Sequence, residues 1–372
     1  MKRFLALIAG FALLGAACAE SADAPSESGD AELAETATTL SPAPSPTPAI
    51  PPPLTAADVF LPRDLSQYGL DPARIRTVIA TGDVIPARYT DKTIRELGND
   101  FNYTVAETKQ TTADADITVI NLEAPLVHYC PLTEGGFTFC GQPGFTEALL
   151  TAGVDVVTLE NNHIGNYGGA GITETQGHLD TASIKWADRY TPTIVDVRGM
   201  KFGFLAFNAV GEVVDRTAMV AGIEALRPQV DVLSVAYHWG AEYLSVPNIS
   251  YGIAEDYPPD LGRLAIDAGA DLIIGNHPHW VQGIEVYKGK LITYAHGNFI
   301  FDQMWSYETR LGVVGKYTFY DAMLIGVEFT PVRIDNYAQP VLLEGDERQA
   351  VLDTMKQATE DLANGVQTTP GA

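Results

Sequence analysis

Each of five short apolar segments in this chain is followed by a side chain that can bind a metal ion or transfer a proton. These side chains are carboxylates, imidazoles and one amide, the groups that bind zinc, manganese and iron in proteins. One such residue is unremarkable, but the pattern repeats five times in order, so we predict one shared site. The residues are Asp83, Glu123, Asn162, His163, His238, His277 and His279.

Taken singly, several of these residues have a plainer interpretation. Asp83 and Asn162 are residue types that favour turns and helix caps, and His277 and His279 are each as compatible with the core or the surface. As a set they favour a site, because a desolvated pocket does not gather so many polar groups without a partner. Two ions about 3.5–4 Å apart would suit an in-line displacement, and such a pair needs a bridging carboxylate.

The apolar segments are rich in β-branched residues, as is typical of strands buried on both faces. Helical patterns lie between them, so we expect parallel pairing through helical crossovers. The ligand crevice of open α/β folds lies at the carboxyl ends of such strands. The predicted strands are 76–81, 116–122, 155–159, 231–237 and 271–274, and the predicted helices are 145–152, 172–183 and 258–268.

Hairpins interrupt this series. Turn sequences occur at 198–201 and 287–290, and two long strands are expected near 321–330 and 333–343. A mixed, two-sheet α/β sandwich therefore fits better than one open parallel sheet. For 346–372 we expect a C-terminal helix followed by a frayed tail.

Sequence motifs surround the candidate residues. They are TGDVIPAR (81–88), NLEAPL (121–126), NNHIGNYG (161–168), HWGAEY (238–243), and GNHPHWVQGIEVYKGK followed by YAHGNFIFDQ (275–303). In this order they resemble the poly-gamma-glutamate capsule synthesis family, the CapA proteins, of the calcineurin-like metallophosphoesterase superfamily. The resemblance covers roughly 76–303. It implies a four-layer α/β/β/α sandwich, with 71–345 as the folded domain and the site at one edge of its two central sheets.

The resemblance also implies roles for single residues. His163 would steady or protonate a leaving group, and it would act together with Asp83 and His238 in catalysis. Two divalent ions are implied, either manganese, iron or zinc. Their ligands would be Asp83, the bridging Glu123 and His279 for one ion, and Glu123, Asn162, His238 and His277 for the other.

Further residues of the same motifs are candidates for substrate contacts or for orienting ligands. Arg88 is expected to pair with an anionic substrate through its planar fork, although a surface ion pair explains it equally well. Trp239 and Trp280 each follow a proposed ligand and are expected to line a substrate cleft. Glu242 and Asn298 are expected to orient metal ligands.

The motifs depart from the family pattern at several positions. Ile85 stands where phosphoesterases carry a histidine, so the first metal ion would lack one ligand. Asn166 replaces an acid, Asn276 stands where histidine is common, and Ala295-His296 replaces Ser-Leu. His296 is expected either to supply a replacement ligand or to face solvent.

The N-terminus predicts export. Lys2 and Arg3 precede the apolar run 4–14, small residues and Cys18, in the order of a secretory signal. We expect 1–17 to be a signal peptide, Cys18 to be lipidated in a membrane-anchored lipoprotein facing the periplasm or cell surface, and 18–70 to be an acidic Ala/Ser/Pro-rich linker. Plain secretion is the alternative.

Charge and cysteine content further limit the kinds of partner and of site that this chain can have. The chain has 23 basic and 47 acidic residues and a net charge of −24, which argues against a nucleic-acid partner. Cys130 and Cys140 are expected to form a disulfide at the rim of the crevice.

Two functions remain open. One is a metal-dependent hydrolase or transferase acting on a phosphoester or amide-type bond of an anionic envelope polymer, and the other is a non-catalytic export or assembly component that binds such a polymer.

Overall fold

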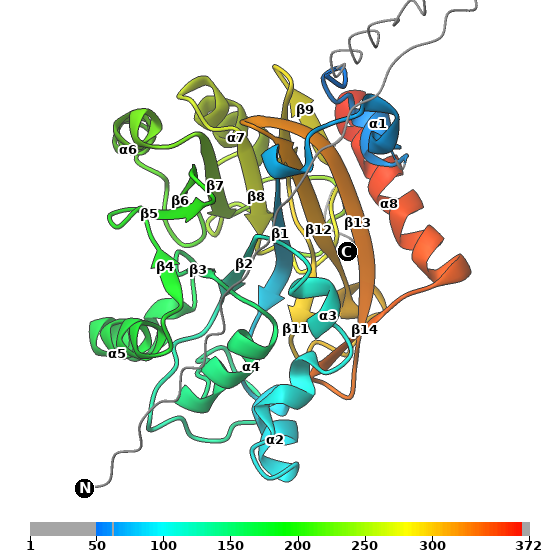
Figure 1. Cartoon of the computed structure of the whole chain (residues 1–372). Helices are drawn as coiled ribbons and strands as arrows, with labels where there is room; N and C mark the ends of the chain where they lie inside the picture. The colour runs from blue at the N-terminus through cyan, green and yellow to red at the C-terminus, as the bar shows by residue number, and fades with distance from the viewer. Residues whose placement is uncertain (1–49, 62, 367–372) are drawn as a thin grey trace, which may run out of the picture. The chain divides into compact units, whose positions relative to one another are not determined.

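The computed structural model describes residues 50–61 and 63–366 (Figure 1). The expected signal peptide 1–17 and the lipidation site Cys18 lie outside these residues. Within the described part of the chain, every helix is too short or too polar to span a bilayer.

The first sheet is mixed, and its parallel half carries the first predicted site residues. Strands β1 (Ile75–Val84), β2 (Ile117–Leu122), β3 (Val156–Thr158) and β4 (Lys185–Ala187) run parallel to one another. On the other side of β1 lie the antiparallel strands β12 (Leu311–Tyr320), β13 (Met323–Asp335) and β14 (Gln339–Leu342). The short strand β11 (Asn298–Ile300) pairs in parallel with the end of β1.

The second sheet is also mixed and has a parallel centre. Its order is β5 (Thr193–Val197), β6 (Met200–Asn208), β7 (Val232–His238), β8 (Leu272–Asn276), β10 (Lys290–Thr293) and β9 (Ile284–Tyr287). The outer strands β5 and β9 are antiparallel to their neighbours and close the hairpins that the sequence predicts.

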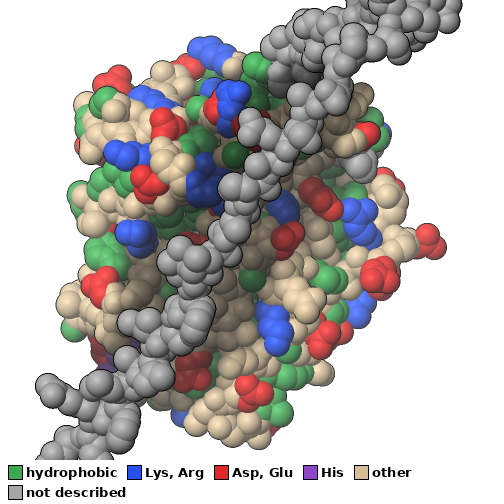
Figure 2. Space-filling model, in the orientation of Figure 1, with side chains coloured by type: hydrophobic (Ala, Val, Ile, Leu, Met, Phe, Trp, Pro, Cys, Tyr) green, Lys and Arg blue, Asp and Glu red, His purple; other side chains and the backbone are tan. Residues whose placement is uncertain are grey.

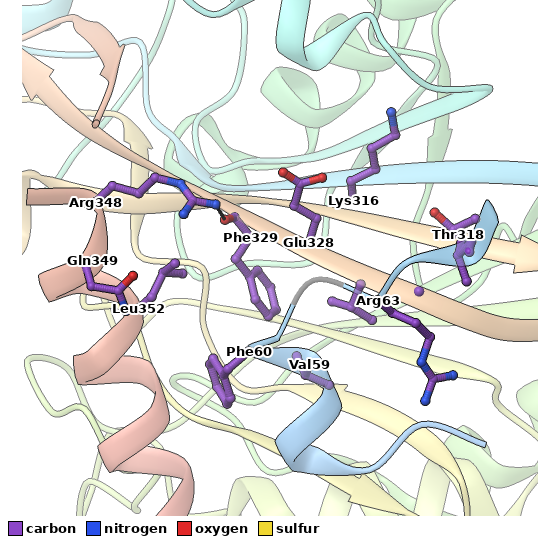
Figure 3. A pocket seen from close by; sticks show the side chains of 13 residues that line it. Val59, Phe60, Arg63, Lys316, Thr318, Glu328, Phe329, Arg348, Gln349 and Leu352 are labelled. Carbon is purple, nitrogen blue, oxygen red and sulfur yellow. Dashed lines mark hydrogen bonds between the residues drawn. The ribbon is translucent and has the colours of Figure 1, made fainter. Parts of the chain in front are cut away.

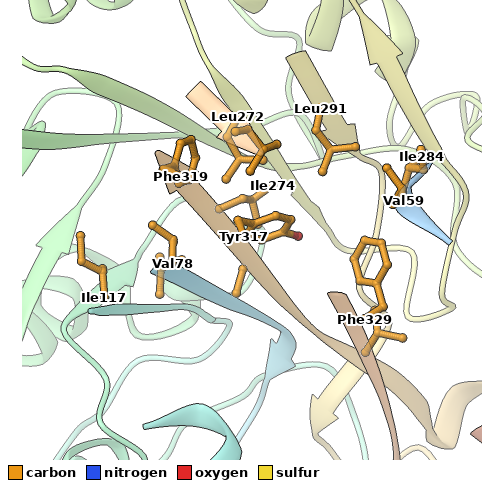
Figure 4. Packing of buried hydrophobic residues seen from close by; sticks show 14 of the residues in the cluster. Val59, Val78, Ile117, Leu272, Ile274, Ile284, Leu291, Tyr317, Phe319 and Phe329 are labelled. Carbon is orange, nitrogen blue, oxygen red and sulfur yellow. The ribbon is translucent and has the colours of Figure 1, made fainter. Parts of the chain in front are cut away.

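Three apolar clusters separate the layers. One cluster joins the facing sides of the two sheets and includes Val78, Ile274 and Tyr317 (Figure 4). A second packs the outer face of the first sheet against its helices, and a third does the same for the second sheet. The expected four-layer α/β/β/α sandwich is therefore confirmed. The outer helices are α2 (Tyr89–Glu96), α3 (Lys109–Thr112), α4 (Thr146–Thr151) and α5 (Gly168–Thr181) on one side, and α6 (Arg216–Leu226) and α7 (Pro258–Asp267) on the other.

Two further helices lie at one side of the sandwich, where both contact β13 of the first sheet and β9 of the second (Figure 1). They are α1 (Ala56–Val59) and α8 (Gly345–Ala363). Leu54, Val59, Val351 and Met355 belong to the cluster between the sheets. The folded body therefore begins before residue 71, within the segment expected to be linker, and α8 is part of the core.

The long strands near the C-terminus differ from the prediction. The turn lies at Asn336-Tyr337, whose φ angles are 50° and 63°, so β13 runs on through the expected boundary before residue 333. The strand β12 was not predicted. Basic and acidic side chains are interspersed over the face shown in Figure 2.

Candidate metal centre

The predicted ligand residues come together where the parallel strands of both sheets end. Asp83 lies in β1, Glu123 follows β2, and His238 ends β7. His277 and His279 follow β8 directly, and Asn162 and His163 lie in the loop after β3. The elements that the sequence predicts thus position all seven side chains in one neighbourhood.

Short distances join the members of this cluster. His279 Nδ1 lies 3.2 Å from Asp83 Oδ2, and His238 Nε2 lies 3.2 Å from Glu123 Oε1. The same His238 nitrogen lies 2.8 Å from Asn162 Oδ1 and 3.1 Å from His277 Nδ1.

Strained backbone presents two of the imidazoles. His277 has a φ of 100° and His279 a φ of 56°, in the region that residues with a side chain rarely adopt. Just before them, a Cβ on Gly275 would lie 2.0 Å from the carbonyl oxygen of Tyr294, so only glycine fits. Strain of this kind persists where the surrounding structure enforces it and clusters at functional sites.

Glu123 is the least satisfied residue of the cluster. Its side chain is fully buried, and neither carboxylate oxygen accepts a hydrogen bond. Burial raises the pKa of Glu123 well above its usual 4.5, and the neighbouring Asp83 raises it further. The Nε2 atom of His277 is likewise buried without a hydrogen-bond partner. Unsatisfied buried groups are costly in a native fold, and a cation among these atoms would remove the cost.

The charges around Glu123 are divided between its neighbours. Burial opposes charge on Asp83 and His279, but their mutual contact lowers the pKa of Asp83 and raises that of His279 to about 9. Burial lowers the pKa of His238 to about 3, and that of His277 well below its ordinary value. The metal-free protein therefore holds one ion pair beside two neutral imidazoles, which are free to act as ligands.

Within this cluster, two sets of donor atoms are compact enough to hold an ion. In each set the ligand atoms lie within 4.8 Å of one another, and Glu123 belongs to both. One set adds Asp83 and His238, and the other adds His277 and His279. Glu123 thus lies where a bridging carboxylate is expected, although the partners in each set differ from those that the sequence resemblance implies.

The sequence profile of the family described as "Bacterial capsule synthesis protein PGA_cap" matches residues 77–303, more than half of the 372-residue chain. The chain belongs to this family. The capsule biosynthesis protein CapA of Bacillus anthracis is 25% identical over 78% of this chain and 74% of its own length. The PGA biosynthesis protein CapA of Bacillus subtilis is 28% identical over 68% and 70%. A crystal structure of a putative 5′-nucleotidase from Staphylococcus aureus overlaps at 14% identity with a TM-score of 0.42, over 76% of this chain and 58% of that one.

Three asparagines support the ligands in this PGA_cap protein. Asn298 Oδ1 lies 2.9 Å from His279 Nδ1. Asn121, which sequence reasoning missed, donates from Nδ2 to Asp83 Oδ1 at 2.9 Å and is itself held by Asn161. Glu242 is partly exposed, and its Oε1 lies 3.9 Å from His277 Nε2, at the outer side of the cluster.

A disulfide-closed loop forms one wall beside His163. Cys130 and Cys140 are bonded to each other. Phe139, next to Cys140, packs its ring 4.2 Å from the ring of His163 and donates its backbone N–H to Asn166 Oδ1 at 2.6 Å. The same Asn166 oxygen lies 3.1 Å from His163 Nδ1. An oxygen that accepts from Phe139 also accepts from Nδ1, which leaves Nε2 of the neutral ring unprotonated.

The structure contradicts two expectations for residues around the cluster, those for Trp239 and His296, and decides between two alternatives for Arg88. Trp239 is fully buried, stacks on Tyr237 and donates its Nε1–H to the carbonyl of Tyr294 at 2.8 Å, so it belongs to the core rather than to a substrate cleft. Of the two interpretations of Arg88, the structure shows the ion pair, because its guanidinium pairs with Asp302.

His296 neither binds with the cluster nor faces solvent. It is fully buried, with Nε2 2.7 Å from the Tyr317 hydroxyl and Nδ1 3.3 Å from the Gly275 carbonyl oxygen. Trp280 is partly exposed, and its Nε1 is shielded without a partner. It stays a candidate for substrate contact.

A cavity of about 600 Å³ adjoins the cluster on the side of Asn162. Its lining includes three carboxylates, Glu160, Asp188 and Glu212, and a single cation, Arg189, which is paired with both glutamates. Another cavity, of about 470 Å³, lies between α1, β13 and α8 and shares no residue with the cluster (Figure 3).

Proposed function

We propose that this PGA_cap protein is a metal-dependent hydrolase or transferase of the cell envelope. Its substrate would be an anionic polymer or a phosphoester, and the bond that reacts would be a phosphoester or an amide-type bond. We further propose that lipidated Cys18 anchors it to a membrane surface. The family membership and the names of the Bacillus relatives support a role in capsule polymer synthesis.

The observation that carries the proposal is the buried Glu123 carboxylate, which lacks hydrogen bonds and lies among donors from both sheets. Carboxylate, imidazole and amide oxygen donors fit manganese, iron or zinc. Asp83, Glu123, Asn162, His238, His277 and His279 would hold the ions, in keeping with the distances between them. When bound, such ions supply Lewis-acid polarisation of a phosphoryl or carbonyl oxygen.

His163 has the features of a proton-transfer group beside this centre. Burial lowers its pKa to about 4, so the ring is neutral at neutral pH. Its Nδ1 lies 3.1 Å from Asn166 Oδ1, which favours the tautomer of the neutral ring that carries its proton on Nδ1. We therefore assign it the role of a base or hydrogen-bond acceptor in the resting protein, rather than that of a proton donor. Positioned acid–base groups contribute about 10²–10⁴-fold to a rate.

The cavity beside Asn162 would receive the part of the substrate next to the reacting bond. Its carboxylates outnumber its single arginine by three to one, so a polyanion would be repelled there in the absence of cations. Bound metal ions offset that repulsion at the cluster itself. The proposal thus makes polymer binding, as well as turnover, dependent on metal.

The test uses the full chain purified without chelator. Elemental analysis should find bound transition metal, and turnover of p-nitrophenyl phosphate or γ-glutamyl p-nitroanilide should identify the bond. Asp83→Ala and His238→Ala should bind less metal than the wild type and their turnover should fall to background, and the turnover of Asn298→Ala should fall about 10–100-fold. Asp114→Ala, which alters an exposed aspartate paired with Lys316, is the control and should retain both.

The outcomes separate the two functions. A metal content of Asp83→Ala equal to that of the wild type, or turnover that survives without metal, would contradict the proposed centre. Metal-dependent binding of poly-γ-glutamate with neither substrate turned over would select the non-catalytic assembly role instead.

A further inference from the structure

Two of the seven histidines lie outside the candidate centre, and they contact each other. Five histidines are in or next to the buried cluster, and His128 and His178 are the remaining two. Their rings meet edge to face with centroids 5.0 Å apart. Glu174, on the same face of α5 as His178, lies between them. The three side chains form a group with the composition of a metal site.

The donor atoms of this group are close to the spacing that an ion requires. Glu174 Oε1 lies 3.5 Å from His178 Nε2 and 3.9 Å from His128 Nε2. One ligand atom from each of the three residues lies within 4.8 Å of the others. Zinc bonds of about 2.0–2.1 Å in a tetrahedron separate the ligand atoms by about 3.4 Å. The side chain of His128 is 71% exposed, so it can move closer to Glu174 and bring the ligand atoms to this spacing.

Hydrogen bonds already hold the group in place. The backbone N–H of His128 donates to Glu174 Oε1 at 2.7 Å, and that of Leu126 donates to Thr175 Oγ1 at 2.9 Å. Both acceptors are on α5, so the loop after β2 is docked on the helix that supplies the other two ligands. The first of these bonds lowers the pKa of Glu174, which keeps its carboxylate charged. An ion would meet a largely pre-formed site.

One atom in the group lacks a partner. The Nε2 atom of His178 is shielded from solvent and makes no hydrogen bond, although it is directed towards Glu174. The contact of this nitrogen with Glu174 Oε1, at 3.5 Å, is too long to replace in full the hydration that it has in the unfolded chain. A metal ion would satisfy it.

We propose that His128, Glu174 and His178 form a second metal site, which takes a zinc-class transition-metal ion with water as the fourth ligand. The site is separate from the candidate centre and does not depend on the proposed function. The bound ion ties the loop at 126–128 to α5. That loop leads to Cys130, so the ion also steadies the disulfide-closed wall that packs against His163.

The test counts zinc in the full chain after removal of metals with a chelator. Titration with ZnCl2 followed by calorimetry and elemental analysis should show one equivalent fewer in His128→Ala and in His178→Ala than in the wild type. Thr173→Ala, an exposed change on the same helix, is the matched control and should keep the full count. Because the His128 side chain is mostly exposed, His128→Ala should fold whatever the fate of His178→Ala.

A second measurement separates this site from the centre. In a Glu123→Gln background, which removes the carboxylate shared by both donor sets of the centre, one zinc equivalent should remain, and adding His128→Ala should remove it. Zinc should also slow modification of His128 by diethyl pyrocarbonate in that background, and MgCl2 should not. Equal zinc counts in the wild type and in both single histidine variants would overturn the proposal, even if the centre binds its metals.

Discussion

Replacing Glu123 by glutamine should stabilise the metal-free protein while abolishing metal binding at the centre. Glutamine has the same shape, carries no charge and offers N–H donors towards Asp83, whereas the wild-type carboxylate is buried without a hydrogen bond. The wild type accepts the cost of this carboxylate only if an ion is there to offset it. Stability and metal binding should therefore respond to the substitution with opposite signs.

The size of the effect follows from proton linkage. The pKa of Glu123 is raised in the folded state, so the folded protein keeps this proton to higher pH than the unfolded chain does. Its contribution to stability is therefore complete below the ordinary carboxyl pKa of 4.5 and decreases as the pH rises. The decrease is up to about 1.4 kcal/mol per pH unit until the raised pKa is reached.

The assay is urea or thermal unfolding of both proteins in chelator at pH 5, 6 and 7. Subtracting the free energy of unfolding of the wild type from that of the variant at each pH cancels, to first order, the contribution of the other titratable groups. We expect the free energy of unfolding of the glutamine variant, relative to the wild type, to rise by up to about 1.4 kcal/mol per pH unit over this range. Each kcal/mol of added stability corresponds to about 2–4 °C in Tm. Manganese or zinc at about 1,000 times its Kd should reverse the order, because at that concentration a ligand stabilises the wild type by about 4.1 kcal/mol. A difference that is independent of pH, or a less stable variant in chelator, would refute the reasoning.

Three further predictions concern other residues. Trp239→Ala should cost about 3–5 kcal/mol in urea unfolding because this ring is fully buried; a loss below 1 kcal/mol would place it elsewhere. Replacing Cys130 and Cys140 with serine should cost about 3 kcal/mol by loop entropy, a loss that dithiothreitol should reproduce in the wild type but not in the variant. Asn166→Asp places a charge 3.1 Å from His163 Nδ1 and should raise the pKa of that ring by about 1–3 pH units, as measured by NMR titration; an unchanged titration would refute the contact.

The candidate centre was predictable because each of its strands can be recognised from a short stretch of the sequence. An apolar run that ends in a ligand residue marks both the strand and its carboxyl end, and parallel order then brings the ends together. Asn121 was missed although a signal existed. It stands two residues before Glu123, and alternate residues of a strand share a face. Reading that period of two through the NLEAPL motif would have found it.

The wrong prediction for Trp239 has the same origin. Neighbouring residues of a strand point to opposite faces, so a residue beside His238 is directed away from the cluster and into the layer of α6 and α7. Adjacency to a ligand therefore argued against a substrate contact. His296 was beyond reach for another reason. Its partner Tyr317 lies 21 residues away on β12, a strand that the sequence did not reveal.

Helix α8 is the last element needed to complete the core between the two sheets. Val351 and Met355 complete the apolar layer between the sheets, yet they are synthesised only after every strand of both sheets. A nascent chain in which all the strands have been synthesised still exposes the apolar surface that Val351 and Met355 cover. A product truncated before residue 351 exposes the same surface. Chaperone contact during synthesis should concentrate there, and α8 should be the first place where a truncation turns a stable domain into an aggregating one.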